Sequence, residues 1–146
     1  MQDSPVGVRD TDFNSVFSSG QTVAASFDRG LLYARGYAMG SEHKGKGVTV
    51  QLGPVAGPLG RSPEGGRNWE GFSPDPCQCP KHMFPIVQSL TMLDLTGIGI
   101  AQTVKGIQDA GVIACAKHFI GNEQVRLNDP SSLIYHNPVN CELSRE

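Results

Sequence analysis

Residues 60–70 form a glycine-bearing segment that holds two arginines, two carboxylates, an asparagine and the single tryptophan. Arginine presents its N–H donors in a fixed fork, which suits the directional hydroxyls of a sugar. The face of Trp69 could cover the apolar C–H face of a pyranose. Phosphate binding is an alternative, but no P-loop Lys-Ser/Thr follows the glycines. A loop tied down by its own Arg–Glu pairs is the structural alternative, and composition leaves it level with ligand binding.

Lys117 and His118 form a second candidate site, because they directly follow the apolar run of residues 112–116. A lone histidine at the end of a buried strand is usually a structural residue. A lysine beside it, at the end of the strand where parallel α/β folds place their working residues, favours a functional role. Asp3 by itself indicates only a turn before Ser4 and Pro5.

The elements that must position these residues follow from hydrophobic spacing. Helical periodicity predicts a helix within residues 23–46, started by Ser26 or Asp28 and stopped near Gly45 and Gly47. A second helix is predicted over residues 96–111, with Gly111 just past its end. The apolar positions that define the two faces are Val23, Phe27, Leu31, Ala34, Ala38, Ile98, Ala101, Val104 and Ile107.

Short apolar segments at residues 48–52 and 112–116 read as strands, the second of them fully buried. A long loop over residues 53–76, rich in Gly and Pro, separates the first strand from the second helix. Strands that alternate with amphipathic helices indicate an α/β fold with a parallel sheet. The loop and Lys117-His118 then both follow strand ends, where function is expected.

Composition excludes several classes of protein. The chain has 146 residues and a net charge of −2, with no basic stripe, so nucleic acid is not an expected partner. No apolar run reaches the roughly 18 residues of a membrane span, and the polar N-terminus has no signal-peptide core. Neither a metal nor another cofactor is expected, because the cysteines lack the paired knuckles of a structural zinc site. These cysteines are Cys77, Cys79, Cys115 and Cys141.

Several motifs in unbroken order resemble fungal β-glucosidases of glycoside hydrolase family 3. They include residues 2–9 (Gln-Asp-Ser-Pro-Val-Gly-Val-Arg), residues 52–61 (Leu-Gly-Pro-Val-Ala-Gly-Pro-Leu-Gly-Arg) and residues 105–111 (Lys-Gly-Ile-Gln-Asp-Ala-Gly). A further match runs over residues 116–124 (Ala-Lys-His-Phe-Ile-Gly-Asn-Glu-Gln). The whole resemblance covers residues 2–76 and 95–124.

The resemblance implies a TIM-like (β/α) barrel domain, here incomplete, and a retaining hydrolysis of terminal β-glucosyl residues in cellobiose and other β-glucosides. Asp3 matches a carboxylate that holds hydroxyls of the glucose whose bond is cleaved. Arg67, Lys117 and His118 match donors around the same sugar. The partner expected is therefore a small β-glucoside or oligosaccharide. An extracellular role in cellulose degradation is implied by the family alone.

The sequence also departs from the family. Residues 77–94 resemble no family element, and residues 125–146 form a divergent tail; translated introns are one hypothesis for both. No local carboxylate matches the family's nucleophile or acid/base motif. We therefore expect a partial N-terminal barrel domain over residues 1–124 that is inactive and folds poorly alone. The alternatives are a non-catalytic sugar-binding remnant and a non-functional truncated gene product.

Overall fold

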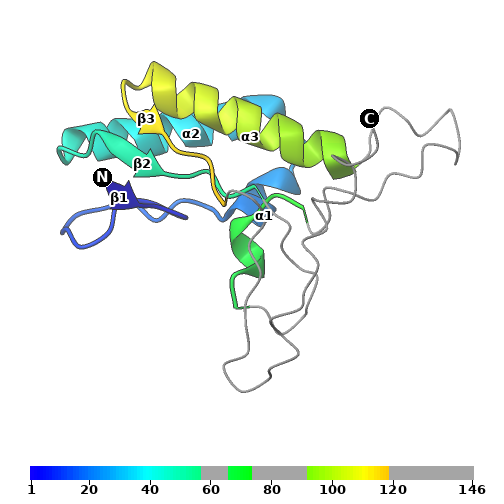
Figure 1. Ribbon diagram of the computed structural model, residues 1–146, viewed down its shortest axis with the longest axis horizontal. Helices are drawn as coiled ribbons and strands as arrows, with labels where there is room; N and C mark the ends of the chain where they lie inside the picture. Colours follow the sequence, from blue (N-terminus) through cyan, green and yellow to red (C-terminus); the bar gives the residue numbers. More distant parts are fainter. Residues whose placement is uncertain (57–65, 74–91, 119–146) are drawn as a thin grey trace, which may run out of the picture.

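The computed structural model describes residues 1–56, 66–73 and 92–118 (Figure 1). Residues 57–65, 74–91 and 119–146 lie outside this description. They include part of the predicted loop 53–76, most of the segment 77–94 and the whole tail 125–146. The elements in chain order are β1 (Gln2–Asp3), α1 (Gly20–Ala24), α2 (Arg29–Gly45), β2 (Val50–Leu52), the 3-10 helix η1 (Asn68–Glu70), α3 (Met92–Asp109) and β3 (Ile113–Ala114).

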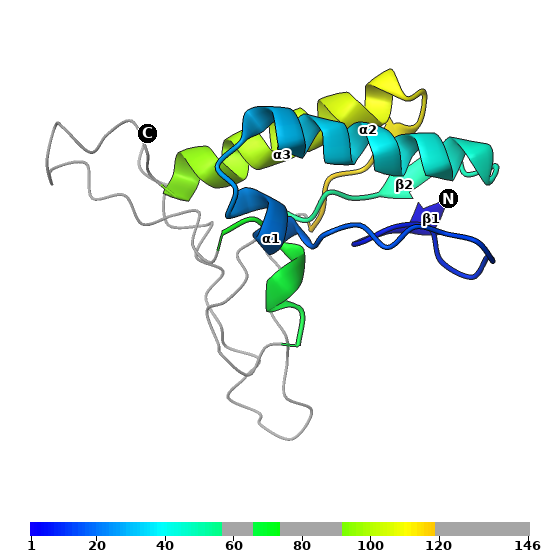
Figure 2. The ribbon, with the colours of Figure 1, turned by 180° about the vertical axis from the view of Figure 1, so that it is seen from behind.

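The three strands form one parallel sheet in the order β1-β2-β3. Asp3 pairs with Leu52, and Gln51 pairs with Ala114, so the strands end at the same edge. Helices α2 and α3 run side by side in the same direction along one face of the sheet (Figures 1 and 2). The predicted α/β arrangement with parallel strands is confirmed, and the described residues cover only a part of any closed barrel.

Helices α2 and α3 touch through glycines. A Cβ atom built on Gly36 would lie 2.5 Å from the carbonyl oxygen of Thr103, and one on Gly106 would lie 2.4 Å from the carbonyl oxygen of Tyr33. The two backbones can therefore meet only where no side chain stands between them. Leu32 and Ile107 are fully buried beside this contact and fill the remaining space.

The first predicted helix is divided in two. Ser19 caps α1, and its hydroxyl accepts from the Thr22 backbone N–H at 3.2 Å. The chain then breaks at Phe27, whose φ of 54° is left-handed. Asp28 starts α2, because its Oδ1 accepts from the backbone N–H groups of Gly30 (2.7 Å) and Leu31 (3.1 Å). The start at Asp28 is confirmed, but Val23 and Phe27, which the apolar pattern included, do not belong to this helix.

The predicted apolar faces are also wrong in part. Phe27 is 69% exposed and Leu31 is exposed, although both were expected in the core. The buried side of α2 contains instead Leu32, Gly36, Met39, Gly40 and His43. A count of apolar side chains misses this face, because its contacts depend on glycine rather than on hydrophobicity.

Strand β3, the second strand that the sequence predicts, is less buried than expected. Ile113 of β3 is 61% exposed, whereas residues 112–116 were expected to be buried completely. Within the described residues β3 lies at the edge of the sheet, so no strand covers its outer side. Gly111, with a φ of +86°, stands just past α3 as predicted.

A small core joins α1 to the end of the long loop. Val23 and Ala24 of α1 pack with Leu32 and Phe72, and α3 adds partly buried side chains from Leu95, Ile98 and Ile100. This core fixes η1, which ends two residues before Phe72, against α1. Over the described residues, no helix is both long and apolar enough to cross a membrane.

Candidate functional site

The site lies at the edge where the parallel strands end. Asp3 is the last residue of β1, and Lys117 follows β3 at an isolated bridge to Val55. Backbone hydrogen bonds from Ala56 N–H to the Lys117 carbonyl (2.7 Å) and from Lys117 N–H to the Pro54 carbonyl (2.9 Å) extend the pairing beyond β2 and β3. The Lys117-His118 and Gly53-Pro54 peptide bonds are both cis.

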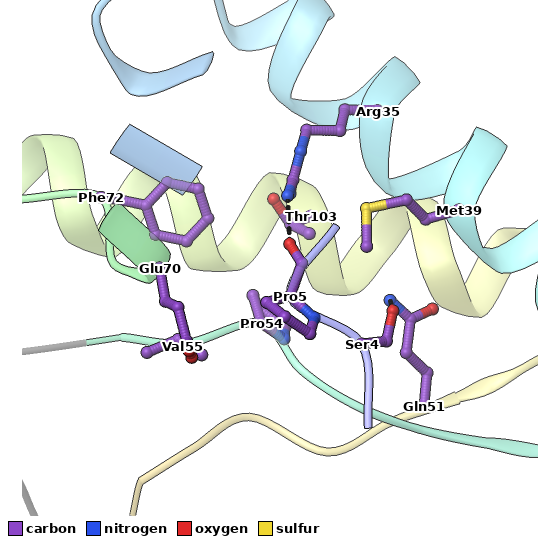
Figure 3. Close-up of a pocket in the computed structure, with 10 residues that line it drawn as sticks. All are labelled: Ser4, Pro5, Arg35, Met39, Gln51, Pro54, Val55, Glu70, Phe72 and Thr103. Carbon is purple, nitrogen blue, oxygen red and sulfur yellow. Dashed lines mark hydrogen bonds between the residues drawn. The ribbon is translucent and has the colours of Figure 1, made fainter. Parts of the chain in front are cut away.

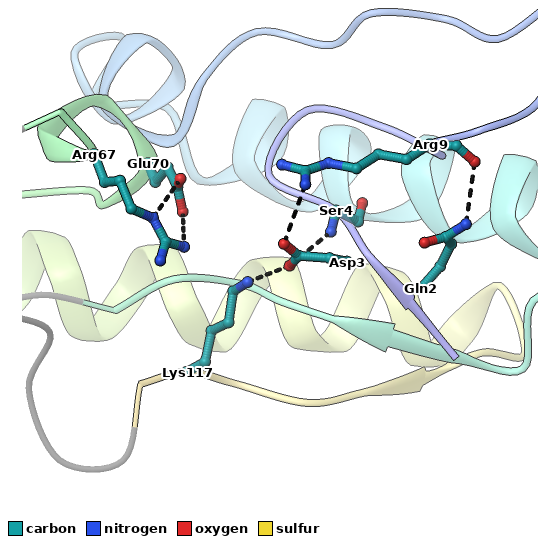
Figure 4. Close-up of polar contacts among 7 residues, drawn as sticks. All are labelled: Gln2, Asp3, Ser4, Arg9, Arg67, Glu70 and Lys117. Atoms are coloured by element: carbon teal, nitrogen blue, oxygen red, sulfur yellow. Dashed lines mark hydrogen bonds and ion pairs between the residues drawn. The ribbon is translucent and has the colours of Figure 1, made fainter.

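Asp3 is surrounded by cations (Figure 4). Lys117 Nζ forms an ion pair with its Oδ1, and Arg9 Nη1 lies 3.5 Å from its Oδ2. The backbone N–H of Ser4 also donates to Oδ1, at 3.1 Å. Partial burial acts to raise the pKa of Asp3, but the hydrogen bond and charge of Lys117 and the charge of Arg9 outweigh it and hold that pKa below its usual value. Asp3 is therefore an ionised acceptor at neutral pH.

Arg67 is held by Glu70 in a two-pronged pair. Its Nε donates to Glu70 Oε1 at 2.9 Å, and its Nη2 donates to Glu70 Oε2 at 2.8 Å. The hydrogen bonds to Glu70 raise the pKa of Arg67 against the opposing effect of burial, so the guanidinium stays charged. The alternative of a loop tied down by its own Arg–Glu pair is confirmed at these two residues. It is compatible with ligand binding, because the fork engages only two of the five N–H groups of arginine.

His118 stands beside both cations. Burial lowers its pKa below the usual 6.5, and the positive charges of Arg67 and Lys117 lower it further, while Glu70 and Asp3 act weakly in the opposite direction. The ring is therefore neutral at pH 7. Its Nδ1 is buried and has no hydrogen-bond partner among the described residues.

The structure brings all four predicted residues into one cluster. Asp3 and Lys117 are in direct contact, and the charges of Asp3, Arg67 and Lys117 all act on His118. They come from three separate segments: β1, the residue before η1, and the segment that follows β3. The other charged members of the predicted loop, Arg61 and Glu64, lie outside the described residues.

One residue of this cluster, Arg9, was missed by sequence reasoning. Arg9 reaches Asp3 because the chain turns back after β1, and the side chain of Gln2 holds the Arg9 carbonyl with a 3.1 Å hydrogen bond. No spacing rule predicts that turn. Glu70 was predicted only as part of the alternative in which Arg–Glu pairs tie down the loop, without its partner being specified. Its position three residues after Arg67 was a usable signal, since an i,i+3 pair meets on one side of a helical turn.

Trp69 lies next to these groups in sequence and is exposed, at 37%. Its Nε1 donates to the carbonyl of Gly66 at 3.2 Å, which ties the indole to its own turn. The expectation that its face covers a sugar remains a prediction.

Comparison with known proteins decides the family. Residues 3–129 match the model of the glycosyl hydrolase family 3 N-terminal domain. The chain belongs to glycoside hydrolase family 3. Within this family it is 58% identical over 124 residues to β-glucosidase 1 of Aspergillus aculeatus. The matched residues make up 85% of this chain and 12% of that protein. It therefore spans about an eighth of the length of such curated relatives.

Solved structures of family 3 enzymes agree. A β-glucosidase from Neurospora crassa superimposes with a TM-score of 0.71 at 64% identity, over 86% of this chain and 13% of that one. β-Glucosidase 3B from Thermotoga neapolitana, solved in complex with glucose, gives a TM-score of 0.66 at 32% identity, over 84% of this chain and 16% of that one. The family 3 fold of the described segment is thus found in both fungal and bacterial members.

Proposed function

We propose that this family 3 chain supplies part of a β-glucosidase barrel, and that Asp3, Arg67, Lys117 and His118 bind the glucosyl unit to be released. The observation that carries the proposal is the cluster itself, in which the ionised Asp3 contacts Lys117 where the parallel strands end and the charges of Asp3, Lys117 and Arg67 act on His118. Parallel α/β folds place their binding residues at this edge. The names of the relatives, β-glucosidases throughout the first matches, support the choice of sugar.

The charges favour a neutral polyhydroxyl ligand over phosphate. The cations Arg9, Arg67 and Lys117 are each already paired with a carboxylate, either Asp3 or Glu70, which leaves a net charge of only +1 on these five groups. A phosphate would have to compete with both carboxylates. A sugar hydroxyl can instead donate to Asp3 and accept from Lys117 or Arg67 at the same time, which matches the mixed donors and acceptors present.

The chemistry of hydrolysis needs a different pair of carboxyl groups. A retaining glycosidase uses a nucleophile and a general acid about 5 Å apart. The pKa of Asp3 is held below its usual value by Lys117 and Arg9, which disfavours the protonated form that a general acid requires, and both oxygens of Glu70 are taken up by Arg67. We propose that these two residues bind and position, and that the nucleophile and the acid belong to other parts of the complete enzyme. Residues 1–124 would then form part of a TIM-like barrel domain, with 77–94 as an insert and 125–146 as a divergent tail.

The expected substrates are terminal β-glucosides such as cellobiose, as the family resemblance implies, and an extracellular role in cellulose degradation belongs to the same proposal.

Non-catalytic sugar binding is the second candidate. It is favoured by the pairing of both carboxylates of the cluster, Asp3 and Glu70, with cations, an arrangement suited to holding a ligand. Both candidates require glucose to bind at the cluster, and they differ only in turnover.

Binding can be measured on the full 146-residue chain, labelled with ¹⁵N, by titration with D-glucose and separately with inorganic phosphate. We expect glucose, and not phosphate, to shift the signals of Lys117 and the His118 ring. Asp3→Asn should abolish the shifts. The matched control is Asp10→Asn, which removes the same charge from an exposed neighbour. Shifts with phosphate alone would contradict the sugar-binding proposal.

Turnover can be tested in a chimaera of the Neurospora crassa relative that carries residues 3–73 of this chain in place of its matched segment. We expect the chimaera to hydrolyse p-nitrophenyl β-glucoside. Asp3→Asn in the chimaera should lower kcat/KM by about 100-fold, because the sugar is no longer held in register with the reacting groups. An inactive but folded chimaera that still binds glucose would favour the non-catalytic candidate.

A further inference from the structure

We propose that Glu70 is a positioning residue whose buried carboxylate sets the orientation of the Arg67 guanidinium toward the sugar. This inference rests on the proposed function, because it gives a role to a residue that supports one of the sugar-binding donors. Glu70 itself would not touch the substrate. Its effect on binding would pass through Arg67.

The exposures of the two partners show which one holds the other. The side chain of Glu70 is 5% exposed, whereas that of Arg67 is 38% exposed. The carboxylate is thus the inner, fixed group and the guanidinium is the outer, accessible one. Two parallel N–H···O bonds fix the plane of the guanidinium as well as its distance, which a single bond would not do.

The backbone of Glu70 is itself held tightly. Helix η1 lies against α1 at Gly20, where an added Cβ would be 2.3 Å from the Glu70 carbonyl oxygen and 3.1 Å from that of Gly71. Phe72, two residues further, belongs to the core that α1 completes. Glu70 is therefore anchored on both sides, by the glycine contact and by the buried phenyl ring.

The space behind Glu70 leaves its side chain little freedom. Glu70 lines a small cavity together with Ser4, Pro5, Val55 and Arg35 (Figure 3). The cavity admits no more than about one water molecule. Arg35 also lines this cavity; its partly buried guanidinium donates to the Pro5 carbonyl at 2.8 Å, and this fixes the chain just after Asp3. The cavity thus lies between Glu70, which holds Arg67, and Arg35, which holds the segment after Asp3.

The charge of Glu70 is essential to this role. Glu70→Gln keeps the size of the side chain, but its amide nitrogen would face one of the Arg67 donors. One of the two hydrogen bonds would be lost, and two donors would be placed in contact. Glu70→Asp keeps the charge on a shorter side chain, so it should retain part of the orienting effect.

The test uses the ¹⁵N-labelled full chain and follows two signals. The Nε–H resonance of Arg67 reports the fork directly, and the glucose titration reports affinity. We expect Glu70→Gln to move the Nε–H resonance toward that of free arginine and to weaken glucose binding by about tenfold, since a donor displaced by a fraction of an ångström loses its alignment. Glu70→Asp should give an intermediate loss. Glu42→Gln is the matched control, because Glu42 also accepts a hydrogen bond, from Ser15 N–H at 2.7 Å, but belongs to α2.

The outcomes separate this inference from the proposed function. A parent chain without glucose-dependent shifts contradicts the proposed function, while the Arg67 resonance still shows whether Glu70 holds the guanidinium. Equal glucose affinities for the parent and a folded Glu70→Gln chain overturn the inference and leave the proposed function intact. If Glu70→Gln fails to fold, Glu70→Asp is compared with the parent chain instead. A Glu70→Asp chain with the parent's glucose affinity and the parent's Arg67 Nε–H resonance overturns the inference. An Arg67 resonance at the free-arginine position in the parent chain also overturns it.

Discussion

The contact between α2 and α3 and the polar cluster at the strand ends are built on opposite principles. In the helix contact, backbone meets backbone at Gly36 and Gly106, and no atom can be added. In the cluster, side chains from distant segments reach one another through charges and hydrogen bonds. The first region should therefore be sensitive to volume and the second to charge.

The two regions should also contribute differently to stability. Close packing between helices loses many dispersion contacts at once when the backbones separate. A partly exposed ion pair contributes at most about 1 kcal/mol, because water competes for both charges. The helix contact is thus expected to hold the fold, and the cluster to provide binding at little gain in stability.

The largest effect should come from Gly106→Ala. The new Cβ would lie 2.4 Å from the Tyr33 carbonyl oxygen and 2.6 Å from the Tyr37 nitrogen, so the helices must move apart. We expect the free energy of unfolding, measured with urea, to fall by about 3 kcal/mol. Gly97→Ala is the control in the same helix, where nothing lies within 4 Å, and it should raise stability by about 0.5 kcal/mol. Equal effects of the two substitutions would remove the distinction between the regions.

Lys117→Met tests the cluster by removing charge while keeping volume. We expect a loss of about 1 kcal/mol in the free energy of unfolding at neutral pH. Asp3 has a folded pKa below its usual 3.8, so its contribution is present above that value and lost as the pH falls through the folded pKa. The variant and the parent should therefore become similar once the pH is below the folded pKa of Asp3, where Asp3 is protonated in both. A difference that is independent of pH would assign the effect to packing.

Asp28→Ala tests a local contribution outside both regions. Removal of the acceptor for the Gly30 and Leu31 N–H groups should lower stability by about 0.7 kcal/mol. Asp28→Ser should recover most of this loss, since a hydroxyl also caps a helix. Both values can be read from thermal unfolding followed by circular dichroism. A larger loss for Asp28→Ser than for Asp28→Ala would argue against capping.

The smallest effect concerns the pH dependence due to His118. Its folded pKa lies below the unfolded value of 6.5, so the folded state binds fewer protons and stability falls as the pH drops from above 6.5 through the folded pKa. Arg67→Met should raise the pKa of His118, because one of the charges that disfavour its protonation is gone. The imidazole NMR titration measures this shift directly. An unchanged pKa in Arg67→Met would place His118 beyond the influence of that guanidinium.

Local signals in the sequence were sufficient for several features. The cap at Asp28, the stop at Gly111 and the parallel order of strands and helices depend on residues close together in the chain, and all are found in the structure. The division between α1 and α2 was missed, because the apolar spacing continues through Phe27 although the backbone does not. Hydrophobic periodicity records the side chains and not the turn between them.

For the candidate site, the sequence predicted some of the residues but not all of the contacts between them. The family motifs identified Asp3, Arg67, Lys117 and His118, and the structure brings them together. The contact of Arg9 with Asp3 could not be deduced, since it depends on how the chain returns after β1. The burial of Glu70 likewise depends on Gly20, which lies 50 residues earlier and gives no sign of that contact in the sequence.

The sequence by itself determined the family, the alternation of strands and helices, and the residue types available for binding. It did so because motifs, caps and periodicity are written in neighbouring residues. Only the tertiary structure decided which face of α2 is buried, which cation pairs with which carboxylate, and which of each pair is the fixed member. Those properties depend on distances between segments remote in the chain, and such distances exist only once α1, η1 and the sheet have packed together.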